Sequence, residues 1–364
     1  MDFKEFLDEW NNGSDRMLVH TSGSTGKPKP IWVEKKRMAH SARTTCRFLG
    51  LKRGDTALLC LSLDYIAGKM MAVRAIEWGL NLICVEPSGH PFSFKVDELT
   101  SKQVDKLVPL VDELTSSKVD KLCDSEASNS STRQLVNSST NIVFAAMTPM
   151  QVYNTLQVPE ERERLMQVKH LIIGGGAIDE ALEADLRLFP NAVWSTYGMT
   201  ETLSHIALRR ISGSEASLWY TPFDGVTVSL DSRGCLVIDA PHVCHTTLTT
   251  NDCAEIRDGK FRILGRIDNV VCSGGIKIQI EEVEQSLKPH IHKRFIITKR
   301  KDKDLGEALT LLTEEADTEA VRNICHRALP KYHQPRHIFY VEEIPLTETG
   351  KPARAKAESI ANSL

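Results

Sequence analysis

The sequence lacks several features that would place it in a specialised class of protein. It has no strong basic excess, because 45 Lys and Arg stand against 48 Asp and Glu, and this argues against a nucleic-acid-binding protein. No apolar run approaches the ~20 residues that a membrane span requires. The first residues, MDFKEFLDEW, show neither the basic nor the apolar region of a secretory signal. These absences predict a cytoplasmic protein with no nucleic-acid or membrane partner.

Paired cysteines are also missing. The nine cysteines are scattered singly and form no C-x-x-C pair, so neither a zinc site nor a disulfide framework is indicated. The 364 residues are enough for two or three domains with a sizeable buried core. Composition therefore indicates a soluble α/β enzyme without specifying its chemistry.

Short apolar runs of strand type alternate with helical patterns in the first half of the chain. The run at 56–61 is followed by a helical stretch at about 65–78. Further runs of the same type lie at 17–19, 81–85, 141–144, 170–173 and 192–194. This alternation is typical of a mostly parallel sheet that is covered by helices.

The pattern changes after about Ser217. Residues 219–239 and 247–264 favour short antiparallel strands joined by turns such as Asp258-Gly259. From about Asn269 the order is strand, helix, strand, strand, helix, strand, ending in a Gly-Lys loop. The helices are expected near 281–287 and 318–329, and the strands include 295–298, 309–313 and 338–341. We therefore expect a large domain at 1–267, with a β-rich piece at 217–267, and a small α+β domain at 268–364.

A tandem duplication interrupts the first half. Residues 96–107 and 111–122 match at ten of twelve positions. Two copies are too few for a solenoid. A duplicated surface helix followed by a polar loop is the favoured interpretation, and a device for binding a partner is the alternative.

A glycine-rich loop follows the first predicted strand. It comprises Thr21, Ser22, Gly23, Ser24, Thr25, Gly26 and Lys27, and continues into Pro28 and Lys29. Glycines expose consecutive backbone N–H groups, while hydroxyls and lysines add donors and positive charge, so the loop suits a polyphosphate. Thr21 and Pro28 stand where a Walker A motif requires Gly and Ser/Thr. A plain Ser/Gly linker is the alternative.

This loop and five later motifs resemble, in the same order, those of the adenylate-forming superfamily, which includes acyl- and aryl-CoA ligases, luciferases and adenylation domains of peptide synthetases. The later motifs are Gly174-Gly175-Gly176-Ala177, Tyr197-Gly198-Met199-Thr200-Glu201-Thr202, Thr250-Asn251-Asp252, Gly265-Arg266-Ile267-Asp268-Asn269 with Ser273-Gly274-Gly275, and Pro345-Leu346-Thr347-Glu348-Thr349-Gly350-Lys351. Within the superfamily, the shortness of the chain, the SGG loop, the stretch 147–151 and the stretch from Tyr65 to Arg74 resemble the o-succinylbenzoate–CoA ligases of menaquinone biosynthesis.

The resemblance implies a reaction in two halves. A carboxylate attacks the α-phosphate of ATP to give acyl-AMP and pyrophosphate, and the thiol of CoA then displaces AMP. The loop with Lys27 would hold the β- and γ-phosphates, Thr200 would touch the α-phosphate, and Glu201 would help to hold Mg. Catalysis would consist mainly of charge neutralisation and alignment.

The resemblance also assigns the remaining nucleotide contacts. Gly175, Gly176 and Ala177 would lie beside the adenine, with Tyr197, Gly198 and Met199 packing near it. Asp252 and Arg266 would hold the ribose. Asn251 stands where the family usually has Gly, and we expect this departure to alter the turn, although Asn tolerates a left-handed conformation fairly well.

The last motif and the hinge belong to the small domain. The ammonium of Lys351 would stabilise the negative charge on the α-phosphate and carboxylate oxygens in the transition state. The small domain would rotate about Asp268 between the two half-reactions, removing Lys351 and admitting CoA near Gly274 and Gly275. As an isolated residue, Lys351 would be interpreted as a solvated lysine.

The proposed acid has two carboxylates, and the one that is not activated needs a cation. By resemblance Arg74 is the first candidate and Lys69 the second, with Ser204 and His205 lining the acyl pocket. An ordinary salt-bridged helix arginine is the alternative for Arg74.

The sequence departs from the family at its beginning. Only about twenty residues precede the phosphate loop, where typical members carry a large N-terminal stretch. Three functions stay open: a compact acid–CoA ligase, with a second subunit as a possible cover; an adenylating enzyme with another acid or acceptor; and a nucleotide-binding relative without turnover. The charged motif residues from Lys27 to Lys351 are all present, which favours activity.

Overall fold

The computed structural model describes residues 1–20, 30–94, 141–347 and 352–364, and these fall into two compact units. The first unit comprises Met1–Val19, Ile31–Ala177 and Leu186–Ser217; the second comprises His20–Pro30, Ile178–Asp185 and Leu218–Leu364. The phosphate loop from Thr21 to Lys27, the tandem duplication and Lys351 lie outside the described residues.

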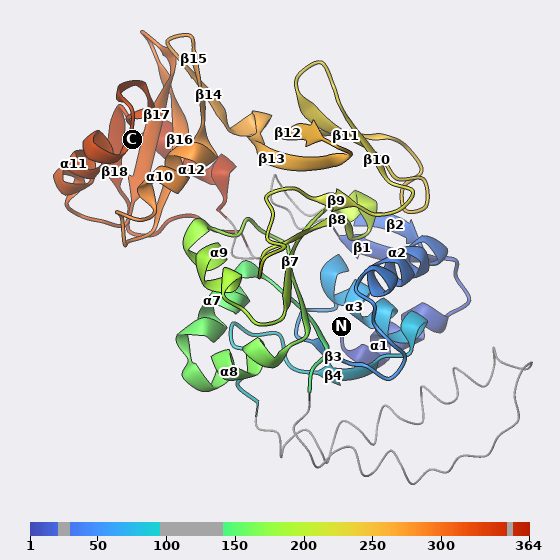
Figure 1. Cartoon of the computed structure of the whole chain (residues 1–364). Helices are drawn as coiled ribbons and strands as arrows, with labels where there is room; N and C mark the ends of the chain where they lie inside the picture. Colours follow the sequence, from blue (N-terminus) through green and yellow to red (C-terminus); the bar gives the residue numbers. More distant parts are fainter. Residues whose placement is uncertain (21–29, 95–140, 348–351) are drawn as a thin grey trace, which may run out of the picture. The chain divides into compact units, whose positions relative to one another are not determined.

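A largely parallel sheet forms the centre of the first unit (Figure 1). Its strand order is β4-β3-β5-β6-β7-β8-β9, in which the strands from β4 to β7 are parallel and β8 runs antiparallel to β7. The strands are β3 (Thr56–Leu59), β4 (Asn81–Cys84), β5 (Phe144–Met147), β6 (His170–Ile173), β7 (Ala192–Gly198) and β8 (His205–Arg210). A separate two-stranded sheet contains β1 (Arg16–His20) and β2 (Pro30–Glu34).

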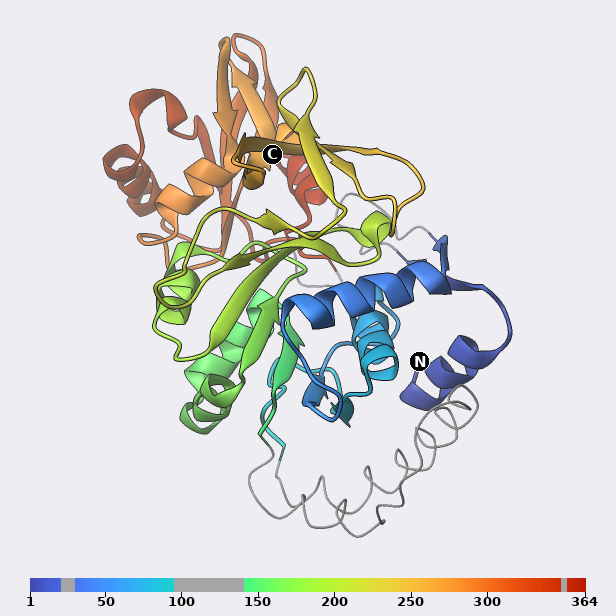
Figure 2. The ribbon, with the colours of Figure 1, turned by 45° about the vertical axis from the view of Figure 1, so that its right-hand side comes forward.

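Helices cover both faces of this sheet. Right-handed crossovers from β3 to β4 and from β5 to β6 run in opposite directions along the sheet, so their helices lie on opposite faces. Figures 1 and 2 show α2 and α3 together on one side, with α7 and α8 on the other. The helices are α1 (Phe3–Asn11), α2 (Lys35–Phe48), α3 (Ile66–Trp78), α7 (Pro149–Gln157) and α8 (Pro159–Gln167). The doubly wound α/β prediction is confirmed.

Local sequence explains where these helices begin and end. Thr148 caps α7 through a reciprocal pair of hydrogen bonds with Gln151. Gly79 ends α3 at φ 68°, a left-handed conformation that glycine adopts without a steric cost. Gly68 lets α3 approach the preceding loop, because a Cβ there would lie 2.2 Å from the Ser62 carbonyl oxygen.

The second unit contains an antiparallel sheet of order β10-β11-β12-β13 and a mixed sheet in which β15-β14-β17-β16 follow one another and β18 pairs with β17. The strands are β9 (Thr221–Pro222), β10 (Thr227–Leu230), β11 (Cys235–Asp239), β12 (Leu248–Arg257), β13 (Lys260–Arg266), β14 (Val270–Ser273), β15 (Ile276–Gln279), β16 (Phe295–Asp302), β17 (Gly306–Thr313) and β18 (His337–Tyr340).

Helices α10 (Ile280–Leu287), α11 (Thr318–Ala328) and α12 (Arg354–Ser363) accompany the mixed sheet (Figure 1). The apolar side chains of α10 and α11 form one core, with Val283, Leu287 and Val321 packed with Ile297 and Leu311. The alanines of α12 belong to a second cluster with Ile296 and Leu312. Among the described residues, helix α9 (Glu180–Arg187) follows β6, and the short turns are η2 (Thr200–Thr202), η3 (Ile267–Asn269) and η4 (Lys331–His333).

Some sequence-based boundaries were wrong. A strand was expected at 141–144, but the corresponding strand β5 runs from Phe144 to Met147. The apolar run continues to Met147, and Thr148 then caps α7. The single strand expected after Asn269 is a hairpin of β14 and β15. Helices α1 and α12 were not predicted. In α12 the buried positions are the alanines Ala357 and Ala361, which give little apolar contrast. No helix within the described ranges is long and apolar enough to cross a membrane.

Candidate active site

The motif residues of the first unit gather at the carboxyl edge of its parallel sheet. Gly174 follows β6, and Gly198 ends the neighbouring parallel strand β7. The backbone N–H of Gly174 donates to the Met147 carbonyl at the end of β5 (3.1 Å). Ligands of doubly wound folds bind at this edge, where the strand order reverses. The reversal here lies between β3 and β5.

Close backbone approaches explain the glycines of these motifs. A Cβ on Gly198 would lie 2.2 Å from the Ser204 carbonyl oxygen and 2.4 Å from the His205 Cα. A Cβ on Gly174 would lie 2.2 Å from Thr196 Oγ1. Gly175 has φ 81°, and it is exposed together with Gly176 and Ala177. Gly174 and Gly198 therefore have no room for a side chain, whereas Gly175 and Gly176 lie exposed at the edge of the sheet.

The motif after β7 is a tight, internally bonded turn. Thr200, Glu201 and Thr202 form η2. The Thr202 hydroxyl accepts from the Met199 N–H, and its one proton faces the carbonyl oxygens of Ser204 (2.7 Å) and Met199 (3.0 Å). Leu203 follows at φ 65°, an uncommon conformation for a non-glycine residue that commonly marks functional sites. Thr200 is buried, Glu201 is exposed, and Tyr197 and Met199 are half-buried.

The turn brings Ser204 and His205 to the buried guanidinium of Arg74. Arg74 lies on α3 and is 2% exposed, and its Nη2 donates to Ser204 Oγ (2.8 Å). Ser204 Oγ lies 3.2 Å from His205 Nδ1. The Arg74 Nε has no hydrogen-bond partner among the described residues. The structure thus brings together three of the four residues predicted to bind the acid.

Burial changes the titration of this cluster. It lowers the pKa of Arg74 to about 10, which still leaves the guanidinium charged at neutral pH. Burial and the charge of Arg74 lower the pKa of His205 well below its usual value, so the imidazole is neutral. The cluster therefore holds one positive charge in a desolvated place.

Lys69, the fourth candidate, lies apart from these three residues. Its ammonium pairs with Glu9 of α1 (3.1 Å) and lies over the ring of Phe6. Both partners belong to α1, so the lysine connects α3 to that helix. The structure gives it a neutralising partner, whereas no carboxylate pairs with Arg74 in the described part of the chain.

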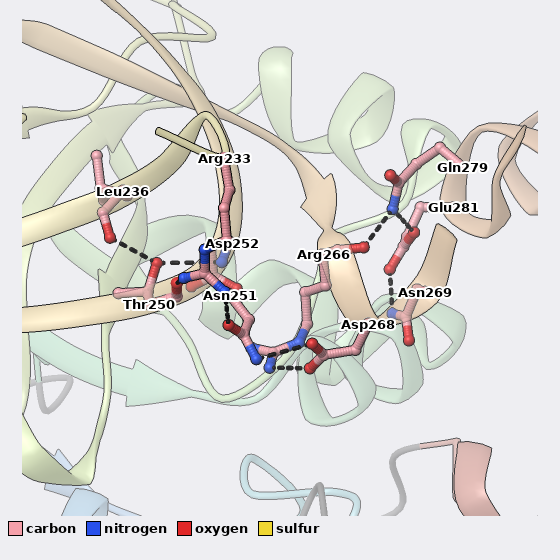
Figure 3. A network of polar contacts seen from close by, with 10 residues as sticks. All are labelled: Arg233, Leu236, Thr250, Asn251, Asp252, Arg266, Asp268, Asn269, Gln279 and Glu281. Carbon is pink, nitrogen blue, oxygen red and sulfur yellow. Dashed lines mark hydrogen bonds and ion pairs between the residues drawn. The ribbon is translucent and has the colours of Figure 1, made fainter. Parts of the chain in front are cut away.

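In the second unit, Asp252 and Arg266 stand directly opposite each other in β12 and β13. Arg266 donates to Asp252 through Nη1 (2.9 Å) and to Asp268 through Nη2 (2.6 Å), as Figure 3 shows. Burial alone would lower the pKa of Arg266, but the hydrogen bonds and charges of the two aspartates raise it. The predicted ribose and hinge residues therefore form one ionic cluster.

Asn251 lies in a strand and not in a turn. It lies within β12, and the positive-φ non-glycine residues of the described chain are Leu203 and Asp258, so no left-handed turn occurs there. Instead its side-chain amide donates to Asp268 (2.7 Å) and its carbonyl oxygen accepts from Arg233 (3.1 Å) (Figure 3). Register with β13 explains this arrangement, and the sequence carried no signal for it.

Gly274 and Gly275 form the two-residue turn between β14 and β15. Their φ values are 56° and 84°, and the flanking residues Ser273 and Ile276 pair directly. Two positive φ values are typical of a type I′ hairpin, which strongly favours glycine. Gly275 has open space where a side chain would stand.

One residue of the first unit's cluster was missed from the sequence. Thr45 of α2 is fully buried, and its hydroxyl oxygen lies 3.0 Å from His205 Nε2. A threonine inside a helical pattern carries no functional signature, and only the packing of α2 against α3 places it here.

Comparisons with known proteins agree with the motifs. Residues 7–229 match the family described as AMP-binding enzyme. A 2-succinylbenzoate–CoA ligase of Bacillus cereus is 22% identical, over 95% of this chain and 70% of that protein. The corresponding ligase of Listeria monocytogenes (serovar 1/2a) is also 22% identical, over 98% of this chain and 72% of that protein.

Solved structures show the same relationship. An acyl-CoA synthetase (AMP-forming)/AMP-acid ligase II-like protein from Dyadobacter fermentans DSM 18053 is 30% identical, with a TM-score of 0.59 over 97% of this chain and 91% of that chain. The O-succinylbenzoate coenzyme A synthetase of Bacillus subtilis, solved with ATP and magnesium ion, shares the fold at 19% identity and a TM-score of 0.67, over 93% of this chain and 69% of that one. The family resemblance is confirmed: the chain belongs to the AMP-binding enzymes and, within them, to the AMP-forming acid–CoA ligases.

Proposed function

We propose that the chain is an ATP-dependent ligase that joins o-succinylbenzoate to CoA for menaquinone synthesis. The assignment of this substrate rests on Arg74, a fully desolvated cation that lacks an acidic partner in the described part of the chain. A buried charge without a counterion is costly, so the site favours a ligand that supplies one. A dicarboxylic acid supplies it with the carboxylate that is not activated. The names of the relatives support the same acid.

In the first half-reaction, the other carboxylate attacks the α-phosphate of ATP, and pyrophosphate leaves. Residues Thr21 to Lys27 hold the β- and γ-phosphates, Thr200 contacts the α-phosphate, and Lys351 neutralises charge as it develops. Gly175 to Ala177 and Tyr197 to Met199 bind the adenine side, while Asp252 and Arg266 bind the ribose. The open carboxyl edge and the ionic cluster of Figure 3 support these assignments.

Glu201 fits a role in holding magnesium. Magnesium binds through one or two carboxylates together with substrate phosphates and water. Glu201 is a single exposed carboxylate in η2, and no group of three metal-binding side chains occurs among the described residues. The ion would neutralise phosphate charge when ATP is bound.

In the second half-reaction, the thiol of CoA attacks the acyl carbon and AMP leaves. We propose that residues 268–364 form a lid that turns about Asp268 and admits CoA beside Gly274 and Gly275. The position of Asp268 in a short turn between two sheets of the second unit supports a hinge, because hinges absorb backbone change at the ends of elements.

The test is pyrophosphate release from ATP with magnesium, measured over a panel of mono- and dicarboxylic acids with and without CoA. We expect release with o-succinylbenzoate, and its thioester only when CoA is present. Release with a different acid would replace the substrate assignment. If folded protein that binds ATP released no pyrophosphate with any acid of the panel, the result would support a nucleotide-binding relative without turnover.

A further inference from the structure

A chain of hydrogen bonds runs from Arg74 through the cluster to α2. Arg74 Nη2 donates to Ser204 Oγ (2.8 Å), and Ser204 Oγ lies 3.2 Å from His205 Nδ1. On the other side of the imidazole, Nε2 lies 3.0 Å from Thr45 Oγ1. Thr45 Oγ1 in turn donates to the Ser41 carbonyl oxygen (3.1 Å). All of these contacts lie in the first unit.

With a neutral imidazole, all four contacts are hydrogen bonds at once in only one arrangement of the protons. A carbonyl oxygen only accepts, so the single Thr45 proton goes to Ser41 and Thr45 Oγ1 must accept from His205 Nε2–H. Nδ1 of this neutral ring carries no proton, so it accepts from the Ser204 hydroxyl, while the oxygen of that hydroxyl accepts from Arg74. These requirements meet in one form of the ring, the neutral tautomer with its proton on Nε2.

The environment of His205 independently supports a neutral ring. Burial and the nearby charge of Arg74 both lower its pKa. A second N–H on the ring would take His205 Nδ1 away as the acceptor of the Ser204 proton and would place a second positive charge beside Arg74.

We propose that Thr45 is a positioning residue that sets acid affinity by holding His205 in the Nε2–H tautomer, so that Ser204 accepts from Arg74 and holds its guanidinium in place. A guanidinium has five N–H donors, and Ser204 takes one of them. The Arg74 Nε has no partner among the described residues and is available to a carboxylate.

This inference rests on the proposed function, because Arg74 is taken to hold the carboxylate that does not react. Contacts to a group that does not react are equal in the ground and transition states, so their loss raises KM and leaves kcat unchanged. A purely structural role for Thr45 would disturb the KM values of the acid and ATP together.

Thr45→Val replaces the hydroxyl with a methyl group of similar size and removes the acceptor. We expect KM for o-succinylbenzoate to rise about fivefold to tenfold, the effect of one buried hydrogen bond, with kcat and KM for ATP unchanged. Thr45→Ser keeps the hydroxyl and should restore the affinity. Thr155→Val is the matched control, because Thr155 is a fully buried helical threonine whose hydroxyl has no partner among the described residues.

A second readout does not depend on the substrate. Long-range proton–nitrogen NMR distinguishes the protonated nitrogen of a neutral imidazole from the unprotonated one, and His205→Gln assigns the signal. We expect Nε2–H in the native protein and in Thr45→Ser, and a loss or mixture of this form in Thr45→Val. A native Nδ1–H signal, or an unchanged acid KM in Thr45→Val, would overturn the proposal. If no acid were turned over, the proposed function would fail while the tautomer measurement would still decide the direction of the chain.

Discussion

The side-chain amide of Asn251 donates a hydrogen bond of 2.7 Å to the carboxylate of Asp268 (Figure 3). Asp268 also accepts from Arg266 (2.6 Å), so two groups donate to the carboxylate of the proposed hinge residue. The motif that Thr250-Asn251-Asp252 resembles has a glycine in its second position, which has no side chain to make the first of these bonds. Asn251 therefore adds one contact to the proposed hinge residue.

Asn251→Gly removes that contact and should change the balance between the two half-reactions. A partly exposed hydrogen bond to a charged group contributes about 1 kcal/mol or less, so we expect the ratio of CoA-dependent to CoA-independent rates to change by about threefold. ATP–pyrophosphate exchange reports the first rate and thioester formation the second. Arg262→Ala, which breaks an exposed ion pair with Glu255 on the same hairpin, is the control. Identical ratios in all three proteins would show that Asn251 has no influence on the hinge.

Gly198→Ala should destabilise the first unit. The new Cβ would overlap the Ser204 carbonyl and the His205 Cα, both of which are backbone atoms and cannot turn away. We expect the free energy of unfolding to fall by about 3 kcal/mol or more, measured by urea denaturation. Gly176→Ala is the control for stability, since its Cβ would meet only Pro149 side-chain atoms, 3.7 Å away. An undiminished free energy in Gly198→Ala would mean that β7 and β8 separate easily.

Much of the parallel sheet was predictable because its strands are buried on both faces. The run His170 to Ile173 is continuously apolar after its first residue and ends at glycine, and β6 has the predicted bounds. The sequence of β5 did not show which part of a longer apolar run pairs with the neighbouring strands. Its end depends on the capping of α7 by Thr148, which a strand pattern does not reveal.

Sequence motifs predicted the candidate site residues, and their roles stay predictions. The resemblance identified Arg74 and Ser204, which are 130 positions apart and in hydrogen-bond contact. Thr45 and Asn251 could not be assigned their contacts, because these depend on helix packing and strand register. For the same reason the ion pair between Lys69 and Glu9 was not expected: it requires α1, which the sequence did not predict.

The stability of the first unit should depend on pH through His205. Its pKa is lowered in the folded protein, so below the ordinary value near 6.5 the unfolded chain binds a proton that the folded chain does not. The free energy of unfolding should therefore be unaffected by this group above that value and should decrease as the pH falls below it. The slope approaches about 1.4 kcal/mol per pH unit.

His205→Gln removes the titrating group and should flatten this slope between pH 6 and pH 5, on the order of one unit below the ordinary pKa. Denaturant unfolding at several pH values measures it. His170→Gln is a useful comparison, because burial and the charges of Lys169 and Arg210 also lower the pKa of His170, so its replacement should remove a separate part of the slope. If His205→Gln left the slope unchanged, the imidazole would not be neutral in the folded protein.

Arg74→Met should separate affinity from stability. The guanidinium is desolvated without a counterion in the described part of the chain, and methionine fills a similar volume without a charge. Replacing a buried charge by an apolar side chain is often neutral or stabilising by about 1–4 kcal/mol. We therefore expect the free energy of unfolding without ligand to be unchanged or higher in Arg74→Met.

The same variant should bind the acid much more weakly. We expect KM for o-succinylbenzoate to rise by about 100-fold, on the scale of a lost charge-assisted hydrogen bond, while KM for ATP stays within about twofold. A monocarboxylic acid gives the control within the experiment, because it has no second carboxylate to lose and its KM should not rise. Equal increases in KM for the acid and ATP would remove Arg74 from the acid site. A large fall in stability would show that the guanidinium is instead a structural group with partners of its own.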